Sequence, residues 1–358
     1  MNKIFKTKNN LNKLLDNKDY GSLIRIFICG LAIILFFAAT PVVIDLTNNK
    51  ILNVKDYQNK SKSILTYTLN KKSNFSQSEE LDEKDLLVDI HSLNDLATDA
   101  VSLDAFTIKQ LFEETNYKLE DVRKTKLVKP IALTLLPPEI KMIESTKKRK
   151  EFFIQIVLPL VLKENNNIKL DRKRLFAIIN KSNNTKAEKK WLNGKYKQYG
   201  IPSKDLSQLK IRMDEIPVSL AIAQAAKETG WGTSRFAQEG NALFGQWTWS
   251  GEGLKPKDSE KNQGHKVMKF NILQASVRAY QRNLNTHPSY KQFRIERAIQ
   301  RDNDEKLESL KLVNFLEKYA ETGKEYTEVL KQIINQNSLT DFDDVDILPT
   351  SLKMKNLI

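Results

Sequence analysis

Hydrophobic residues recur at helical spacing along most of the chain. Between residues 79 and 116 one predicted face carries Leu86, Ile90, Leu93 and Ala97, and residues 102–114 repeat the trend. Residues 128–138 predict an extended segment that ends in the turn signal Pro137-Pro138. We therefore expect a helical extension over residues 79–127 that packs on a larger domain over residues 128–340.

Further helical patterns precede the middle of the chain. Residues 150–163 predict a strongly apolar helix that Pro159 should kink. Asn165-Asn166-Asn167 predicts a loop after it, and Asp171 is the expected cap of a helix that ends at Ile179. Two more helices are expected, over residues 186–198 and 204–212, the first with aromatic residues that should pack: Trp191, Tyr196 and Tyr199.

The segment Ile216–Trp249 has the most informative pattern. Apolar residues from Val218 to Ala225 predict a helix packed on several sides, and Pro217 suits its first helical position. A single carboxylate, Glu228, closes this helix before Gly230 ends it. A dense run of aromatic residues and glycines follows.

After Phe244 the spacing changes from helical to alternating. Residues 246–249 and 265–270 alternate around a loop that contains Gly, Lys and Pro, which predicts one small β-hairpin with a long tip. Helices should follow over residues 273–285, 290–301, 307–319 and 326–335, with an acidic tail over residues 341–358. The predicted fold is mainly α-helical with one small β-hairpin.

Residues 26–44 contain no charged residue and approach the ~20 apolar residues of a membrane helix. Residues 1–25 carry six Lys or Arg against two Asp, so the positive-inside rule predicts a cytoplasmic N-terminus. We expect a single transmembrane helix that anchors the chain in the cytoplasmic membrane, with the bulk of the protein on its outer side. A cleaved signal peptide is the alternative, but Phe37 or Ala38 would hold its key position and Pro41 follows.

The amino-acid composition limits the classes of ligand and cofactor that the protein is expected to bind. The 358 residues include 58 Lys or Arg against 44 Asp or Glu, a net charge of +14, which attracts anionic lipids, wall polymers or nucleic acid. The sequence has no stripe of basic residues interleaved with aromatic residues of the kind that would favour nucleic-acid binding. Residues 45–78 are polar and predict a linker. Cys29 is the single cysteine and the three histidines lack metal-ligand spacing, so neither a disulfide, a metal nor another cofactor is expected.

Glu228 is the candidate for acid chemistry. The C-terminal end of a helix carries partial negative charge, which disfavours an ionised carboxylate nearby. Apolar and aromatic neighbours disfavour the charge further by desolvation. Both effects should raise the pKa of Glu228, which suits a general acid at neutral pH.

The same segment carries a family resemblance. The run AKETGWGTSRFAQEGNALFGQWTW contains an E-x-G-W-G-x-S element at residues 228–234 and an N-x-L-F-G element at residues 241–245. It resembles the signature of bacterial N-acetylglucosaminidases that cut peptidoglycan, glycoside hydrolase family 73, and within that family the Bax-type proteins. Further similarity lies in residues 111–123, 152–168 and 276–290, so it covers roughly the C-terminal two thirds of the chain.

The resemblance implies a lysozyme-like domain in which Glu228 donates a proton to the leaving glycosidic oxygen. It places a second carboxylate, where one is used, in the hairpin, and Glu252 ranks ahead of Asp258 and Glu260 because it is nearest the aromatic strand. The substrate's own 2-acetamido group is the alternative. Tyr280 looks like the family tyrosine near the reacting sugar, although core packing explains it equally well.

Four aromatic residues are candidates for stacking on sugar faces: Trp231, Phe244, Trp247 and Trp249. Aromatics more often fill cores, and Phe244 is the one most expected to do so. Asn241 either positions backbone at the cleft or forms a turn.

We therefore expect a membrane-anchored hydrolase that cleaves the β-1,4 bond after N-acetylglucosamine in peptidoglycan, without a cofactor. The nearest alternatives of the same fold are a muramidase and a lytic transglycosylase, whose sequences after the glutamate differ from the pattern here. A non-catalytic wall-binding scaffold is the alternative from another class, and a nucleic-acid binder is disfavoured by the outward orientation.

Overall fold

The computed structural model describes residues 90, 103–248, 253–254, 266–303 and 306–348. The chain divides into two compact units, residues 1–71 and 72–358, and all described residues belong to the second. The predicted cytoplasmic segment, transmembrane helix and linker (residues 1–25, 26–44 and 45–78) lie outside the described residues. Within the described part, no helix combines the length and apolar character needed to cross a membrane.

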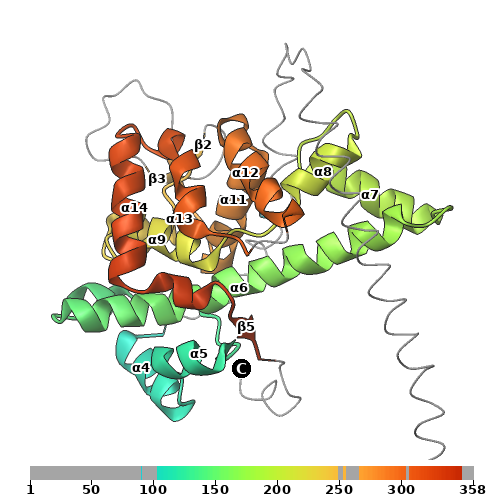
Figure 1. Ribbon diagram of the computed structural model, residues 1–358. Coiled ribbons are helices and arrows are strands. Elements are labelled where there is room, and N and C mark those ends of the chain that lie inside the picture. The colour runs from blue at the N-terminus through green and yellow to red at the C-terminus, as the bar shows by residue number, and fades with distance from the viewer. Residues whose placement is uncertain (1–89, 91–102, 249–252, 255–265, 304–305, 349–358) are drawn as a thin grey trace, which may run out of the picture. The chain divides into compact units, whose positions relative to one another are not determined.

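Two short helices pack on a long one at the start of the described domain. α4 (Ala105–Glu114) begins at Asp104, whose carboxylate caps it, and α5 (Leu119–Thr125) follows after a turn. The ring of Phe112 in α4 lies 5.8 Å from that of Phe152 in α6 (Thr146–Ile179). Figure 1 shows α4 and α5 beneath α6, so residues 103–127 share one hydrophobic core with the rest of the domain.

α6 is one continuous helix of 34 residues, so the predicted loop at Asn165–Asn167 is wrong. The side chain of Asn165 is buried, donates to the carbonyl oxygen of Ile216 at 2.7 Å and accepts from its N–H at 3.2 Å. This tertiary contact satisfies the amide inside a helix and overrides its local turn preference. Asp171, expected as a cap, lies within the helix, which Ser145 caps instead.

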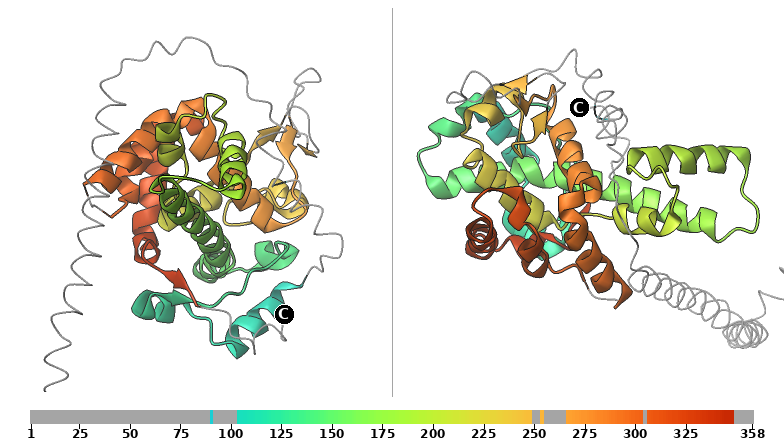
Figure 2. Two further views of the ribbon diagram at one scale, coloured as in Figure 1. Left: turned by 90° about the vertical axis from the view of Figure 1, so that its right-hand side faces the viewer. Right: turned by 90° about the horizontal axis from the view of Figure 1, so that it is seen from above.

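α7 (Lys186–Gln198) confirms a predicted helix and begins with a capping box formed by Thr185 and Glu188. It packs with the last turns of α6 and with α8 (Leu206–Arg212) around a small separate cluster of buried side chains that includes Leu175, Tyr196, Tyr199 and Leu209. The right-hand view of Figure 2 shows α7 and the C-terminal half of α6 running alongside each other.

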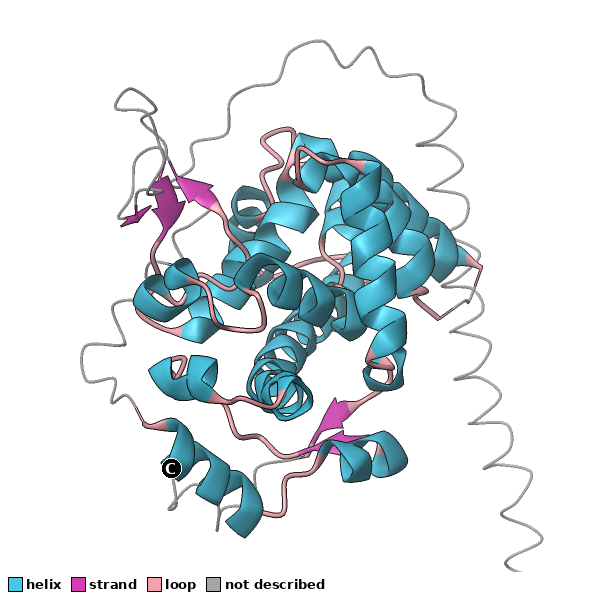
Figure 3. Ribbon diagram, turned by 90° about the vertical axis from the view of Figure 1, so that its left-hand side faces the viewer, coloured by secondary structure: helices cyan, strands magenta, loops and turns pink. Residues whose placement is uncertain are grey.

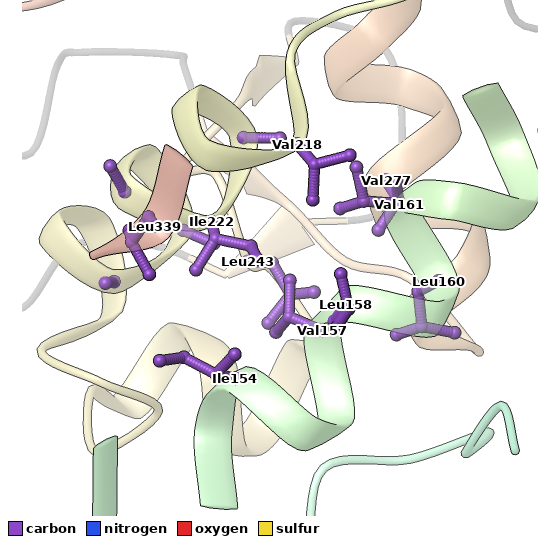
Figure 4. Close-up of a cluster of buried hydrophobic side chains, with 14 of the residues drawn as sticks. Ile154, Val157, Leu158, Leu160, Val161, Val218, Ile222, Leu243, Val277 and Leu339 are labelled. Atoms are coloured by element: carbon purple, nitrogen blue, oxygen red, sulfur yellow. The ribbon is translucent and has the colours of Figure 1, made fainter. Parts of the chain in front are cut away.

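α9 (Val218–Thr229) is the central helix. Every residue from Val218 to Ala226 is buried, mainly by α6, by α14 (Lys324–Gln336) and by the 3-10 turn η5 (Leu339–Phe342). Figure 4 shows Val218 and Ile222 in this core, among side chains of α6 and Leu339. Pro217 occupies the N-cap rather than the first helical position, because its ψ of 135° is extended.

A small sheet follows α10 (Arg235–Gly240). Its strands β2 (Trp247–Thr248), β3 (Gly253–Leu254) and β4 (Lys266–Met268) lie in the antiparallel order β2-β4-β3. The predicted hairpin is therefore a three-stranded sheet, because Gly253 and Leu254 from the expected loop pair with Met268 and Val267. In Figure 3 this sheet lies at one side of the helices, apart from a second pair of strands.

The remaining helical elements pack on the helices already described and on one another. They are α11 (Leu273–Thr286), α12 (Lys291–Asp302) and α13 (Ser309–Leu312), with the 3-10 turns η1 (Pro138–Met142), η2 (Pro288–Tyr290), η3 (Val313–Phe315) and η4 (Glu317–Tyr319). The predicted helix over residues 307–319 is thus broken into short turns, which bury Leu312, Val313 and Leu316 in the core.

The first residues of the predicted acidic tail belong to the domain. Phe342 and Val345 are buried, and β5 (Asp346–Ile347) pairs in parallel with β1 (Leu127–Val128). Charge alone indicated a solvated end, but the apolar residues between the aspartates direct this segment into the core. The mainly helical class is confirmed, whereas the lysozyme-like arrangement stays a prediction.

Candidate active site

The turn after α9 determines where Glu228 lies. Gly230, Trp231 and Gly232 have successive positive φ values of 57°, 60° and 84°. The N–H groups of Gly230 and Trp231 both reach the carbonyl of Ala226, and Gly232 N–H donates to the hydroxyl of Thr229 at 2.9 Å. A Cβ on Gly232 would meet Phe153 of α6 at 3.1 Å, so α6 approaches this turn closely. The helix therefore ends sharply, with Glu228 in its last turn.

Glu228 is half-buried between two distant parts of the chain. Its Oε1 accepts a 2.9 Å hydrogen bond from the hydroxyl of Tyr326 in α14. Its Oε2 lies 3.4 Å from the position that a Cβ would take on Gly245 and, apart from the chain neighbours of Gly245, no other described residue comes within 4 Å of that position. Burial raises the pKa of Glu228, against the opposing effects of the Tyr326 hydrogen bond and the Lys227 charge. The direction agrees with the prediction from sequence.

A chain of buried hydrogen bonds orients the Tyr326 hydroxyl. Tyr280 donates to Oε1 of Gln224 at 2.7 Å, and Nε2 of Gln224 donates to the Tyr326 oxygen at 3.0 Å. Gln224 has no exposed surface. Because Tyr326 already accepts from Gln224, its own proton is directed at Glu228. Tyr326 and Gln224 lie outside the sequence motifs, so no local pattern pointed to either residue.

Further tyrosines surround this group. The rings of Tyr319 and Tyr326 stack with centroids 5.5 Å apart, and the Tyr290 ring lies 6.0 Å from that of Tyr319. Burial raises the pKa of each, to about 12 for Tyr290, and the Glu228 charge adds to the shift. All of them therefore stay protonated at neutral pH, and Tyr319 and Tyr326 donate hydrogen bonds to Phe244 and Glu228.

Phe244 and Tyr280 stack face to face inside the core, with centroids 3.9 Å apart and planes within 8°. Both side chains are buried, and the Phe244 carbonyl accepts a 2.8 Å hydrogen bond from the Tyr319 hydroxyl. Phe244 therefore packs as expected. The structure places Tyr280 behind Glu228, linked to it through Gln224 and Tyr326, with no exposed surface toward a bound sugar.

Asn241 and Trp231 serve as local supports in this structure. Asn241 ends α10 with a φ of 49°, donates to the Phe270 carbonyl at 3.0 Å and accepts from Leu136 N–H at 3.3 Å. Trp231 is partly exposed and packs edge-on against Phe153. A role for either residue in binding sugar stays a prediction.

The remaining predicted site residues belong to a segment that the structure describes only in part. Trp247 belongs to β2, but its side chain is outside the described part of the structure, as are Trp249 and the three candidate second acids, Glu252, Asp258 and Glu260. Among the described residues, no cluster of His, Cys, Asp and Glu is suited to hold a metal ion. The described site thus offers one shielded carboxyl group, one oriented phenol and open space beside Oε2.

This arrangement suits glycosidic bond cleavage, and comparison with known proteins points to the same chemistry. Residues 204–339 match the glucosaminidase family model, described as mannosyl-glycoprotein endo-beta-N-acetylglucosaminidase. The chain is a glycoside hydrolase of the endo-β-N-acetylglucosaminidase class.

The chain also resembles one curated relative over more than its catalytic segment. It is 30% identical over 206 residues to "Protein bax" of Escherichia coli (strain K12), which covers 56% of this chain and 74% of that protein. It belongs to the Bax-type glucosaminidase family, as the sequence motifs predicted. No solved structure matches the chain significantly.

Proposed function

We propose that this protein hydrolyses the β-1,4 bond after N-acetylglucosamine in peptidoglycan, with Glu228 as the general acid. The observation that carries the proposal is the carboxyl group of Glu228, whose pKa is raised by burial and whose Oε1 is held by Tyr326. The open space beside Gly245 leaves Oε2 available to a substrate oxygen. The family description supports a glycan substrate.

In the proposed reaction, protonated Glu228 donates its proton to the glycosidic oxygen as the bond from the sugar C1 to that oxygen breaks. Positive charge develops on the sugar ring, and the Tyr326 hydrogen bond stabilises the Glu228 carboxylate that forms. Water then adds to C1 and loses a proton, which returns to a carboxylate of the site and finally to Glu228, and a reducing N-acetylglucosamine end is left. Either the Glu252 carboxylate or the substrate's 2-acetamido oxygen assists at C1.

The test is the identity of the new ends. Purified peptidoglycan is digested with the full-length protein, reduced with borohydride and analysed by mass spectrometry. Reduced N-acetylglucosamine ends are expected, whereas reduced N-acetylmuramic acid ends indicate a muramidase and anhydro ends a lytic transglycosylase. Wall binding without any product would favour the non-catalytic scaffold.

A matched pair of variants assigns the acid. Glu228→Gln should abolish product formation, because an amide cannot donate this proton. Glu239→Gln on α10 makes the same chemical change at an exposed residue that pairs with Arg235, and it should leave cleavage unchanged. Equal activity in the two variants would remove Glu228 from the mechanism.

We also propose that residues 26–44 anchor the protein in the cytoplasmic membrane with the catalytic domain outside. The support is the uncharged segment and the basic residues before it. Expressed in its host, the full-length protein should resist extraction from membranes by alkaline carbonate, and added protease should digest its domain only from the outer side. A shortened, carbonate-soluble protein would instead indicate a cleaved signal peptide.

A further inference from the structure

A second groove lies away from Glu228, between α7, the C-terminal half of α6 and α11. It has a volume of about 1050 Å³. Gln281 on its α11 wall donates to Asn165, which in turn binds Ile216 just before α9 begins. Glu228 lies near the opposite end of this helix, about 15 Å from Val218 along its axis. The groove is therefore distinct from the catalytic site.

The α7 wall also lies outside the matched catalytic segment. The family model begins at residue 204, after α7 ends, whereas α11 lies within the match. Figures 1 and 2 show α7 beside α6 at the end of the domain away from α4 and α5. The lining residues of α6 also precede residue 204, so two of the three walls, α6 and α7, lie outside the segment that the family model covers.

The acidic residues that line the groove are paired with basic residues, whereas two of its lysines are exposed to solvent. Of its acidic residues, Asp171 pairs with Lys195, and Glu164 accepts two hydrogen bonds from Arg278 at 2.9 and 3.0 Å. Lys190 and Lys197 are exposed, and neither forms an ion pair or hydrogen bond with any residue that the structure describes. The groove thus carries excess positive charge toward solvent.

Lys190, Gly194 and Lys197 share one face of α7, at helical spacings of four and three residues. A Cβ on Gly194 would meet no atom of the described residues within 4 Å, so in this part of the chain the space between the two lysines is open. Trp191 adjoins this opening, and its ring is held by Arg174, whose guanidinium lies 4.7 Å from the ring centroid. A ligand can therefore reach the helix surface between two ammonium groups and an aromatic ring.

The α11 wall supplies unsatisfied acceptors. Gln281 and Asn285 line the groove and are 2% and 1% exposed. Their amide nitrogens donate to Asn165 and Asp214, but their amide oxygens have no hydrogen-bond partner within the described part of the chain. These oxygens are buried, so a ligand rich in O–H and N–H donors would satisfy them once the two side chains turn toward the groove.

We propose that this groove binds a carboxylate-bearing glycan, namely a peptidoglycan strand with its peptide stems, outside the catalytic site. The lysines pair with the carboxylates, the Trp191 ring packs against the apolar face of a sugar, and the amide oxygens accept from hydroxyl and acetamido groups. The identity of the glycan rests on the proposed function, whereas the groove itself does not.

The test measures binding with cleavage switched off. Full-length protein carrying Glu228→Gln is titrated by calorimetry with soluble peptidoglycan fragments released by a muramidase. Lys190→Ala/Lys197→Ala and, separately, Gly194→Gln are added to this background. The second change fills the opening and raises helix propensity, so loss of folding does not explain its effect. Lys118→Ala/Lys124→Ala, two exposed lysines at α5, is the matched charge control.

Each groove variant should weaken binding at least about fivefold, the scale of one lost charge-assisted contact, while the control stays within about twofold. Fragments with amidated carboxylates should bind the parent and the lysine variant equally. Equal affinity of groove and control variants would overturn the proposal, as would displacement of the fragments by an equimolar oligothymidylate.

The same groove variants with Glu228 restored separate the two proposals. If the proposed function is wrong, no variant with Glu228 restored will produce reduced N-acetylglucosamine ends. If the groove does not bind glycan, the groove variants will bind the fragments as tightly as the parent protein, while reduced N-acetylglucosamine ends still form. Cleavage of a short soluble fragment should keep its kcat in the groove variants, because they leave the catalytic site intact.

Discussion

The hydroxyl of Tyr326 donates a 2.9 Å hydrogen bond to Oε1 of Glu228, a residue 98 positions earlier in the chain. Gln224 and Tyr280 extend this contact into the core. The candidate acid is therefore held by a helix that lies far from its own motif in sequence. The contact also favours the ionised form, so Tyr326 moderates a pKa that burial raises.

Tyr326→Phe should lower kcat and shift its pH profile. A general acid works while protonated, so activity falls as pH rises through the pKa of Glu228. Removing the hydrogen bond raises that pKa further and moves the basic limb to higher pH. The carboxylate product also loses about 1.5–3 kcal/mol of stabilisation, or roughly ten- to a hundredfold in kcat. Initial rates between pH 4 and 9 measure both effects.

Tyr280→Phe is the control for this variant. It removes a buried hydroxyl that contacts Gln224 but not Glu228, so we expect about 1–2 kcal/mol lower stability and an unmoved basic limb. If Tyr280→Phe reduced kcat as strongly as Tyr326→Phe, the hydrogen bond from Tyr280 to Gln224 would be required to orient Tyr326.

Gly245→Ala should impair catalysis more than folding. The new Cβ would lie 3.4 Å from Oε2 of Glu228, in the space proposed for the glycosidic oxygen. The φ of 60° adds about 1–2 kcal/mol of backbone strain. We expect kcat/KM to fall at least about tenfold, with a melting temperature only a few degrees lower. A lowered melting temperature with unchanged kinetics would show that substrate does not use this space.

Asp343 should make stability pH-dependent. It accepts from the N–H and the hydroxyl of Ser219 at the start of α9, and burial raises its pKa to about 6. A raised native pKa means that the native state favours the protonated form. Protonated Asp343 therefore adds about 3 kcal/mol to the free energy of unfolding below pH about 4. This stabilisation is lost as pH rises through about 6.

Asp343→Asn removes the ionisation while an amide oxygen can still accept from Ser219. Urea unfolding of both proteins at pH 4, 5, 6 and 7 measures the effect. The wild type should lose stability relative to the variant as pH rises. A constant difference between the two proteins would show that Asp343 does not titrate in this range.

Asp214 should be a major contributor to stability. It is 3% exposed and pairs with Arg297, which has no exposed surface, and with Arg301. Burial by itself would raise the pKa of Asp214, but Arg172, Arg301 and Arg297 hold it well below its usual value. Asp214→Asn leaves a buried guanidinium without its carboxylate and should cost about 3–5 kcal/mol. Because the native pKa is depressed, this loss should shrink as pH falls below about 4.

The matched change is Asp341→Asn, which breaks an ion pair with Arg123 whose side chains are 43% and 30% exposed. Solvent screens that pair, so the cost should be about 1 kcal/mol at most. Chemical denaturation at pH 7 compares the two variants. Similar losses would mean that the buried arginines do not depend on Asp214.

Local patterns predicted most helices but not how they join. Apolar spacing placed α7, α9, α11, α12 and α14 close to their observed bounds. Asn165–Asn167 predicted a turn, yet Asn165 stays helical because its amide bonds to Ile216, 51 residues away. Gly253 and Leu254 carried no strand pattern, and pairing with β4 makes them a strand.

By itself, the sequence determined the family, the mainly helical class and the position of Glu228 at a helix end. Those features depend on residue types within a few turns of one another, where spacing is set by backbone geometry. Tertiary structure alone decided that Tyr326 orients Glu228, that Asp343 caps α9 and that α7 and α11 enclose a second groove. Such contacts join residues about a hundred positions apart. Their selection depends on how whole helices bury their apolar faces, which no local pattern encodes.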